Sequence, residues 1–521
     1  MHTLIHVIVL VTLALGVSFA RAGADEPGEG ERIYEQHCAA CHGAGRIGQM
    51  GPALLPESLA RLKPAVAKQV IANGRAATQM PAFAGTLSTA QIDAVAAWIY
   101  TDTGVVPEWS AAQIRASRIV HADASTLPNK ISFDADPLNL FLVVEQGDHH
   151  VSVLDGDKME RAHRFASRFA LHGGPKFTPD GRFVYFASRD GWITKYDIWN
   201  LTPIAEIRAG INTRNLAVSS DAKVIAVANY LPHSLVLLDG DLNLIKVIEA
   251  KDASGEHSSR VSAVYDAAPR KSFVAALKDV PELWEISYDP EAEAVATGYI
   301  HDYQYKEGSF VPGYLNPRRT VLDDVLDDFF FTQDYAEVMG TARKTHQGQV
   351  VNLDVRRKIA DLAISGMPHL GSGITWQWEG RTVMASPNLK EGKISIIDMK
   401  DWSLLKEVKT LGPGFFMRSH ENSPYAWIDS MMSREGHDTL QILDKRTFEI
   451  VGTVSEPGKT LAHIEFERNG RYAIASLMEM DGAIIFYDAN TWQEIKRLPA
   501  SKPIGKYNVF NKTRRSEGTS H

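Results

Sequence analysis

The architecture is indicated first by the stretch GRFVYFASRDGWITKYDIW, residues 181–199, in which two apolar runs flank the polar turn SRDG. Val, Ile, Phe and Tyr alternate here with polar residues, a pattern typical of strands in a sheet. The second run, ITKYD, ends at Asp197. The stretch therefore predicts an antiparallel strand pair whose second strand ends at an aspartate.

This aspartate-terminated strand recurs along the chain. Its eight copies are VSVLD, ITKYD, LVLLD, WEISYD, VVNLD, ISIID, LQILD and IIFYD, which end at Asp155, Asp197, Asp239, Asp289, Asp354, Asp398, Asp444 and Asp488. Another apolar run precedes each copy, and turn pairs such as Asp180-Gly181 separate strands. The spacing is close to the roughly 40–50 residues of a four-stranded propeller blade. We therefore expect an eight-bladed β-propeller over residues 131–511, with seven blades as the alternative.

One interval between copies is longer than the others. It runs from Asp289 to Asp354 and contains HDYQYKEGSFVPGYLNPRR, residues 301–319. We expect an insertion in the propeller near this segment.

The N-terminal part has a different pattern. Both cysteines of the chain lie in CAACH, where Cys38 and Cys41 precede His42. C-x-x-C-H is the attachment motif of a c-type haem, in which the thiols bond to the macrocycle and the histidine binds iron. Met80 in QMPAF is the expected second axial ligand, because a thioether stabilises ferrous iron and suits electron transfer. Met50 is the alternative ligand, and a C-x-x-C disulfide is the alternative use of the thiols.

Helical signals follow Met80. Ser88 and Gln91 form an S-x-x-Q capping box. Apolar residues then recur at helical spacing, at Ile92, Val95, Ala96 and Ile99. This region resembles class I cytochromes c. The fold class is therefore α + β multidomain: an α-helical cytochrome c domain (25–106), a linker (107–130), the propeller, and a polar, disordered tail (512–521).

Composition and the N-terminus limit the location. The apolar run over residues 3–20 is followed by small residues, which predicts a cleaved signal peptide over residues 1–24 and a periplasmic protein. An uncleaved anchor is the alternative, since ~18 apolar residues just span a bilayer. The 55 basic residues are scattered among 63 acidic ones, for a net charge of −8. We therefore expect no nucleic-acid partner and no stable membrane insertion of the body of the protein.

A cytochrome c motif, a PEW linker and eight blade repeats together resemble the cytochrome cd1 family. That family includes periplasmic nitrite reductases and relatives in haem d1 biosynthesis. The resemblance covers nearly the whole mature chain. It rests on HGGPKFTPDGRFVYFASRDGWITKYDIW (172–199), AGINTRNLAVS (209–219), FFMRSHENSPYAWID (415–429) and KPIGKYNVFN (502–511).

The resemblance also implies site residues. His172 would be the proximal iron ligand of a d1-type haem, and Arg189 and Arg214 would pair with its carboxylates, for which a guanidinium is well suited. His420 would lie on the distal side, where an imidazole suits the role of a catalytic base. His369 and His463 are secondary candidates.

The sequence departs from the nitrite reductases where their first distal histidine is expected. The chain reads MASPNLKEG there, and neither Pro387 nor Asn388 donates a proton as an imidazolium does. The chain is therefore more similar to the dihydro-haem d1 dehydrogenases of haem d1 biosynthesis. That resemblance implies oxidation of a propionate side chain of dihydro-haem d1 to the acrylate as the last biosynthetic step, with electrons leaving through haem c.

Two other functions remain as alternatives: a haem d1 carrier or assembly protein for nitrite reductase, and a cytochrome cd1 nitrite reductase. The expected partners of the dehydrogenase are the dihydro-haem d1 substrate and an external electron acceptor such as a periplasmic cytochrome. Nitrite reductase and other haem d1 assembly proteins are further candidate partners.

Overall fold

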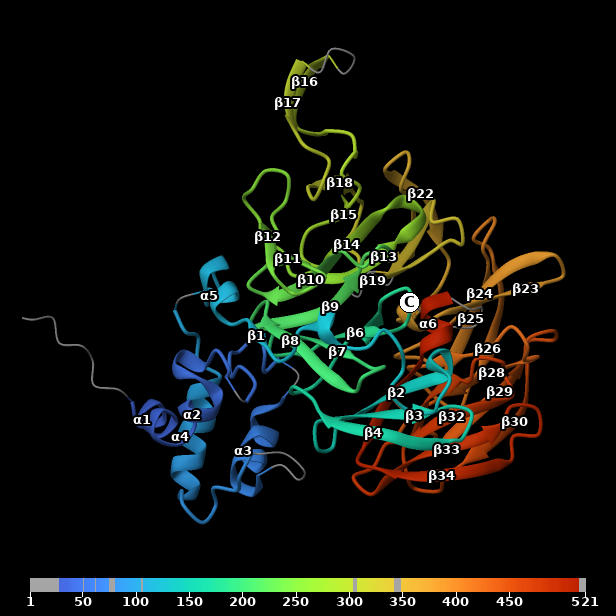
Figure 1. Ribbon diagram of the computed structural model, residues 1–521, viewed down its shortest axis with the longest axis horizontal. Helices are drawn as coiled ribbons and strands as arrows, with labels where there is room; N and C mark the ends of the chain where they lie inside the picture. The colour runs from blue at the N-terminus through green and yellow to red at the C-terminus, as the bar shows by residue number, and fades with distance from the viewer. Residues whose placement is uncertain are drawn as a thin grey trace, which may run out of the picture.

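The computed structural model describes residues 28–49, 51–60, 62–74, 80–104, 106–302, 307–341 and 348–514. A helical N-terminal domain lies beside a ring of β-sheets, next to strands β1 (Ile119–Val120) and β8 (Thr202–Arg208) (Figure 1). The predicted signal peptide and Met50 lie outside the described residues. Among the residues described, no helix is both long enough and apolar enough to cross a membrane.

Short helices around one apolar cluster make up the N-terminal domain. They are α1 (Glu29–His37), α2 (Ala39–His42), η1 (Ala44–Arg46), α3 (Pro64–Asn73) and α4 (Thr89–Ile99). Ser88 and Gln91 form the predicted capping box, in which each side chain accepts the other residue's backbone N–H. The four apolar residues predicted for the inner face of α4 are all buried. The prediction of a helical domain is therefore confirmed.

Helix α1 crosses α4 so closely that position 30 has no room for a side chain. A Cβ atom on Gly30 would lie 2.4 Å from the carbonyl oxygen of Ala94 and 2.7 Å from the Cβ of Trp98. Gly30→Ala should push the helices apart and lower the free energy of unfolding of this domain by about 1–3 kcal/mol. Denaturant unfolding followed by haem absorbance measures this. Gly28→Ala is the matched control, because a Cβ there meets nothing within 4 Å; equal midpoints for both variants would contradict the close crossing.

Eight antiparallel sheets form the ring, seven of four strands and one of five, which confirms the eight-bladed propeller. In chain order, the first four blades are β35 (Pro503–Asn508), β2 (Leu140–Glu145), β3 (His150–Asp155) and β4 (Glu160–Ala166); β5 (Lys176–Phe177), β6 (Phe183–Ala187), β7 (Trp192–Asp197) and β8; β9 (Asn212–Val218), β10 (Val224–Leu231), β11 (Ser234–Asp239) and β12 (Leu244–Glu249); and β13 (Val261–Ala267), β14 (Ser272–Leu277), β15 (Glu282–Ser287) and β18 (Pro317–Val321).

The other four blades are β19 (Asp328–Phe331), β20 (Glu337–Thr341), β21 (Gly348–Asn352) and β22 (Arg357–Leu362); β23 (Ile374–Trp378), β24 (Arg381–Pro387), β25 (Lys393–Asp398) and β26 (Leu404–Lys409); β27 (Met417–Arg418), β28 (Tyr425–Asp429), β29 (Thr439–Asp444) and β30 (Glu449–Ser455); and β31 (Leu461–Phe466), β32 (Tyr472–Leu477), β33 (Gly482–Asp488) and β34 (Glu494–Ala500). First strands of several neighbouring blades contact one another, among them β9 and β13 and also β31 and β35, so these strands line the centre of the ring. The C-terminal strand β35 pairs with β2 and closes the ring.

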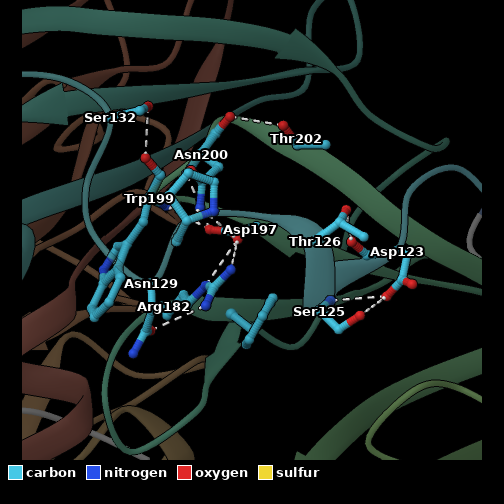
Figure 2. Close-up of polar contacts among 12 residues, drawn as sticks. Asp123, Ser125, Thr126, Asn129, Ser132, Arg182, Asp197, Trp199, Asn200 and Thr202 are labelled. Atoms are coloured by element: carbon cyan, nitrogen blue, oxygen red, sulfur yellow. Dashed lines mark hydrogen bonds and ion pairs between the residues drawn. The ribbon is translucent and has the colours of Figure 1, made fainter.

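The recurring aspartate has a structural role. It lies at or just after the end of the third strand of each blade, and in seven of the eight blades its carboxylate accepts N–H groups of the following turn. In the fifth blade Asn352 caps the turn instead of Asp354. Asp197 Oδ1 accepts Trp199 N at 2.9 Å and Asn200 N at 3.1 Å. Figure 2 shows the same carboxylate held by Arg182. The repeat that predicts the blades is thus a turn cap rather than a chemical group.

The predicted insertion is a β-hairpin. Strands β16 (Val295–Asp302) and β17 (Glu307–Val311) pair only with each other and project from the ring between β15 and β18 (Figure 1). The short 3-10 helices of the chain outside the N-terminal domain are η2 (Ala124–Thr126), η3 (Pro137–Asn139), η4 (Ala268–Arg270) and η5 (Leu370–Ser372).

The connecting segment is packed rather than loose. Helix α5 (Ala111–Ala116) buries Ile114 in the propeller core, and β1 adds a fifth strand to the second blade. Trp109 Nε1 donates to Arg208 O at 2.8 Å. The prediction of a disordered tail is wrong for residues 512–514, because α6 (Val509–Arg514) continues through them and lies at the centre of the ring (Figure 1). Residues 515–521 lie outside the described part.

Candidate functional site

The CAACH motif presents an imidazole prepared to bind iron. Cys38 follows α1, and Cys41 and His42 lie in α2. His42 is 8% exposed, and its Nδ1 donates to Pro52 O at 2.8 Å. The lone pair is therefore on Nε2, the usual arrangement of a metal-binding histidine. Burial lowers the pKa of His42, which keeps the ring neutral.

The loop at Gly51 packs directly against the imidazole of His42. A Cβ on Gly51 would lie 2.8 Å from Cε1 of His42. Cys38 and Met80 pack against the same apolar cluster, and burial raises the pKa of the Cys38 thiol to about 11. Two thiols, an imidazole with a free lone pair and a nearby thioether fit a c-type haem. The structure thus places the four predicted haem c residues in one domain.

His172, Arg189 and Arg214 come together at one end of the propeller, as predicted. His172 lies between β4 and β5, Arg189 in the β6–β7 turn, and Arg214 on β9. His172 Nδ1 donates to Arg214 O at 2.7 Å, so Nε2 carries the lone pair and accepts Arg189 Nη2 at 2.8 Å. Arg214 Nη1 lies 3.3 Å from the same Nε2. The geometry of His172 therefore repeats that of His42: a backbone carbonyl fixes one nitrogen, and the other is left to accept.

A line of aromatic and imidazole side chains borders the centre of the propeller beside His172 and its two arginines. We call it the ring belt, and its ring centroids are spaced as follows: His369 to Phe415 4.1 Å, Phe415 to Phe416 4.6 Å, Phe416 to His463 4.3 Å, and His463 to Tyr507 5.5 Å. Tyr507 in turn lies against Gly174, where a Cβ would be 3.0 Å from its ring. The belt therefore leads from the sixth blade back to the loop that carries His172.

The two imidazoles of the belt have opposite hydrogen-bonding states. His369 Nδ1 donates to Phe415 O at 2.8 Å, which leaves the lone pair on Nε2. His463 Nδ1 instead accepts Lys506 N at 3.3 Å, so its Nε2 carries the hydrogen. That Nε2 is buried and has no acceptor among the described residues. Burial lowers the pKa of both histidines, and Lys506 and Arg418 lower that of His463 further.

The predicted place of His420 beside this group is wrong in the structure. His420 lies in the turn between β27 and β28, whereas Phe415 and Phe416 precede β27 at the other end of the blade. Its Nδ1 accepts Asn422 N at 3.1 Å, and its Nε2 donates to Arg468 O at 3.1 Å. The side chain is 0% exposed. Neither ring nitrogen is available to a substrate in this arrangement.

Sequence reasoning missed most of the ring belt. Phe415, Phe416 and Tyr507 lie within stretches that carry the family resemblance, so a signal was present. The secondary candidates His369 and His463 both belong to the belt. The local sequence did not distinguish these two histidines from His420, because all three lie within or next to short strands.

The haem c loop is fastened to the same end of the propeller. Arg208, at the end of β8, donates from Nη1 to Gly48 O at 3.0 Å, from Nη2 to Ile47 O at 2.5 Å and from Nε to Asp190 O at 2.9 Å. It is 4% exposed, and Trp109 covers its guanidinium at 4.7 Å. Arg208 therefore links the loop between His42 and Pro52 to the residue next to Arg189.

Comparison with known proteins gives a consistent result. The Cytochrome D1 heme domain family matches residues 135–512, and the family of Cytochrome C oxidase, cbb3-type, subunit III, matches residues 25–99. The chain is similar to a dihydro-heme d1 dehydrogenase of Pseudomonas aeruginosa, with 53% identity over 514 residues, 98% of this chain and 100% of the relative. A nitrite reductase of Stutzerimonas stutzeri is 24% identical over 95% of this chain.

A solved structure extends this similarity to three dimensions. The structure, of dihydro-heme d1 dehydrogenase NirN in complex with DHE, is 54% identical to this chain. The TM-score is 0.87, and the match covers 93% of this chain and 100% of that one.

Proposed function

This chain belongs to the Cytochrome D1 heme domain family, and we propose that it is a periplasmic oxidoreductase that dehydrogenates dihydro-haem d1. The reaction converts a propionate side chain of the macrocycle to the acrylate, the last step of haem d1 biosynthesis. The observation that carries the proposal is the His172 Nε2 lone pair flanked by two guanidiniums, in a chain that matches a dihydro-heme d1 dehydrogenase over its full length. Anaerobic incubation with the substrate and an oxidised acceptor tests it, because the product is lighter by two hydrogens.

The N-terminal domain would hold one haem c. Cys38 and Cys41 would carry the thioether bonds, and His42 and Met80 would be the axial ligands. When bound, haem c supplies a one-electron acceptor, through which the two electrons of the substrate leave to an external acceptor such as a periplasmic cytochrome.

The propeller would hold the substrate by its iron and its carboxylates. His172 Nε2 is the proposed iron ligand, with Arg214 O fixing the ring. Arg189 Nη2 now donates to that nitrogen, while Arg214 Nη1 lies 3.0 Å from Nδ1 and 3.3 Å from Nε2. With iron bound at Nε2, both guanidiniums would turn to the substrate carboxylates. The ring belt supplies flat apolar surface beside the macrocycle.

The chemical step removes two protons and two electrons from adjacent carbons of the propionate. We assign the base to His369, because its Nε2 carries a free lone pair beside the belt, whereas both nitrogens of His420 are engaged. His369 Nε2 takes the proton from the carbon next to the carboxylate, and the second proton passes to solvent. An arginine on that carboxylate stabilises the charge that develops as the first proton leaves.

The alternative functions have less support. At the position of the missing distal histidine, Asn388 is 1% exposed, and its Oδ1 accepts Lys390 N and Glu391 N of its own loop and Met367 N of the segment between β22 and β23. This residue therefore fixes a loop and supplies no proton to nitrite. A haem d1 carrier would bind the same ligand unchanged, which the mass measurement distinguishes. Nitrite reductase and other assembly proteins remain proposed partners for delivery of the product.

Removal of the Arg208 link should slow electron transfer between the domains. Arg208→Gln loses the bonds to Ile47, Gly48 and Asp190, so the haem c loop is no longer held beside the propeller site. We expect the single-turnover reduction of haem c by bound substrate to slow by roughly ten- to a hundredfold, with substrate affinity and haem c potential unchanged. Arg115→Gln, on an exposed residue of α5, is the control. An unchanged rate in Arg208→Gln would contradict this role.

A further inference from the structure

Arg418, on β27, is a buried cation that forms no ion pair among the residues that the structure describes. It is 3% exposed, and its Nη1 donates to the neighbouring Met417 O at 2.7 Å. Its Nε is buried and has no acceptor in the described part of the chain. Arg182, which is also buried, pairs with Asp197 at 2.8 Å. A buried charge without a counter-ion is costly, so Arg418 requires an explanation.

The nearby acids already have hydrogen-bond partners. Glu465 Oε1 accepts Asn511 Nδ2 at 3.0 Å and Phe466 N at 3.1 Å, whereas its Oε2 is buried and has no hydrogen-bond partner among the described residues. Asp429 accepts the backbone N–H groups of Phe415 and His463, and burial raises its pKa to about 6. Neither acid lies within ion-pair distance of Arg418.

The basic groups around Arg418 outnumber these acids. Burial together with the charge of Arg418 holds the pKa values of Lys506, Lys512 and His463 well below their ordinary values. These shifts favour the neutral forms of the three groups, and a ligand that brings a carboxylate would stabilise their charged forms and the guanidinium of Arg418.

A second donor without an acceptor faces the same region. Phe416 and Arg418 are two residues apart in an extended segment, so their side chains lie on the same side of it. The Phe416 ring lies 4.3 Å from the ring of His463, on the neighbouring strand β31. His463 Nε2 carries a hydrogen and has no acceptor among the described residues. A cavity of about 590 Å³ reaches the neighbours of this cluster, since Asn511 and Lys512 line it, although Arg418 and His463 themselves do not.

We propose that Arg418 and His463 form a carboxylate subsite that accepts one acidic side chain of the tetrapyrrole substrate. Arg418 Nε and His463 Nε2 donate to the two oxygens of that carboxylate. Together with Arg189 and Arg214, this subsite would fix the rotation of the macrocycle about the His172–iron axis. It would thereby select which propionate lies beside His369. The inference rests on the proposed function, since the ligand is the same substrate.

The test is binding of dihydro-haem d1 to the full-length, haem c-loaded protein, followed by absorbance. Arg418→Gln and His463→Gln should each raise Kd by about ten- to a hundredfold, and Arg418→Lys should restore only part of the affinity. Arg446→Gln, at a 72% exposed side chain of the same blade, should leave Kd unchanged. Equal Kd values for wild type and Arg418→Gln would overturn the subsite. Failure of the wild type to bind would instead contradict the proposed function.

Two further measurements separate binding from a structural role. Substrate derivatives are prepared in which one carboxylate at a time is converted to an amide. One derivative should bind the wild type more weakly than the others do, and for this derivative Arg418→Gln should cause no further loss of affinity. Without substrate, Arg418→Gln should melt at or above the wild-type Tm, because it removes an unpaired buried charge. A lower Tm in Arg418→Gln combined with no selective loss for any derivative would show that Arg418 is structural.

Discussion

His369→Gln should lower the rate of dehydrogenation by roughly 10²–10⁴-fold and leave the binding of dihydro-haem d1 nearly unchanged. The reason is that Phe415 O accepts the Nδ1 hydrogen and Phe415 packs 4.1 Å from the ring, so Nε2 is held in place as the proton acceptor. A glutamine side chain fills similar space without a basic nitrogen. Single-turnover formation of the acrylate product, measured by quenching and mass, reports the step directly.

The pH dependence of this step follows from the same residue. Burial lowers the pKa of His369, so the neutral, basic form is already complete near neutral pH. The rate should therefore stay level on going from neutral to alkaline pH and fall only on acidification below that lowered pKa. His420→Gln is the matched control, because its imidazole is engaged on both nitrogens. Loss of the reaction in His420→Gln with a normal rate in His369→Gln would reverse the assignment.

The second large effect concerns the N-terminal domain. Cys38→Ser combined with Cys41→Ser should abolish covalent haem attachment and reduce turnover with an external acceptor to background, because the two electrons have no route out. Binding of dihydro-haem d1 to the propeller should persist, since His172 and the arginines lie in the other domain. Covalent haem is measured on denatured protein, and turnover and binding are measured in parallel.

Its control is a neighbouring surface change. Glu35→Gln alters an exposed residue of α1 and should preserve both haem attachment and turnover. Wild-type turnover in the double cysteine variant would contradict the route through haem c. Loss of substrate binding in that variant would contradict the separation of the two sites.

The order of blades was predictable because each one repeats a local pattern. A strand that ends at an aspartate such as Asp197 is recognised from its own turn alone, and the structure has an aspartate-capped turn in seven of the eight blades, with Asn352 as the cap in the remaining one. The haem c residues were predictable for a related reason: Cys38, Cys41 and His42 are adjacent in sequence and bind one rigid ring.

The propeller site depends on contacts that no local pattern contains. Tyr507 meets Gly174 only because β35 pairs with β2 and closes the ring. Which end of the blade a histidine occupies depends on the direction of its strand: His369 precedes β23, and His420 follows β27. From the sequence alone it could not be predicted at which end of its strand each histidine lies.

The packing of the connecting segment was likewise hidden. Ile114 and Trp109 contact residues of β8 and the second blade that lie far along the chain. Arg208 donates to three backbone carbonyl oxygens. Every residue has a backbone carbonyl, so the sequence contains no pattern that predicts these bonds. Buried donors without acceptors, such as Arg418 Nε, appear only when every neighbour is in place.

The central claim is best tested by anaerobic incubation of the haem c-loaded protein with dihydro-haem d1 and an oxidised one-electron acceptor. The tetrapyrrole is then extracted and its mass measured, with His369→Gln as the matched variant. A product lighter by two hydrogens in the wild type, formed together with two equivalents of reduced acceptor, is the predicted result. A tetrapyrrole that binds tightly and is recovered with its mass unchanged would contradict the dehydrogenase and leave a carrier.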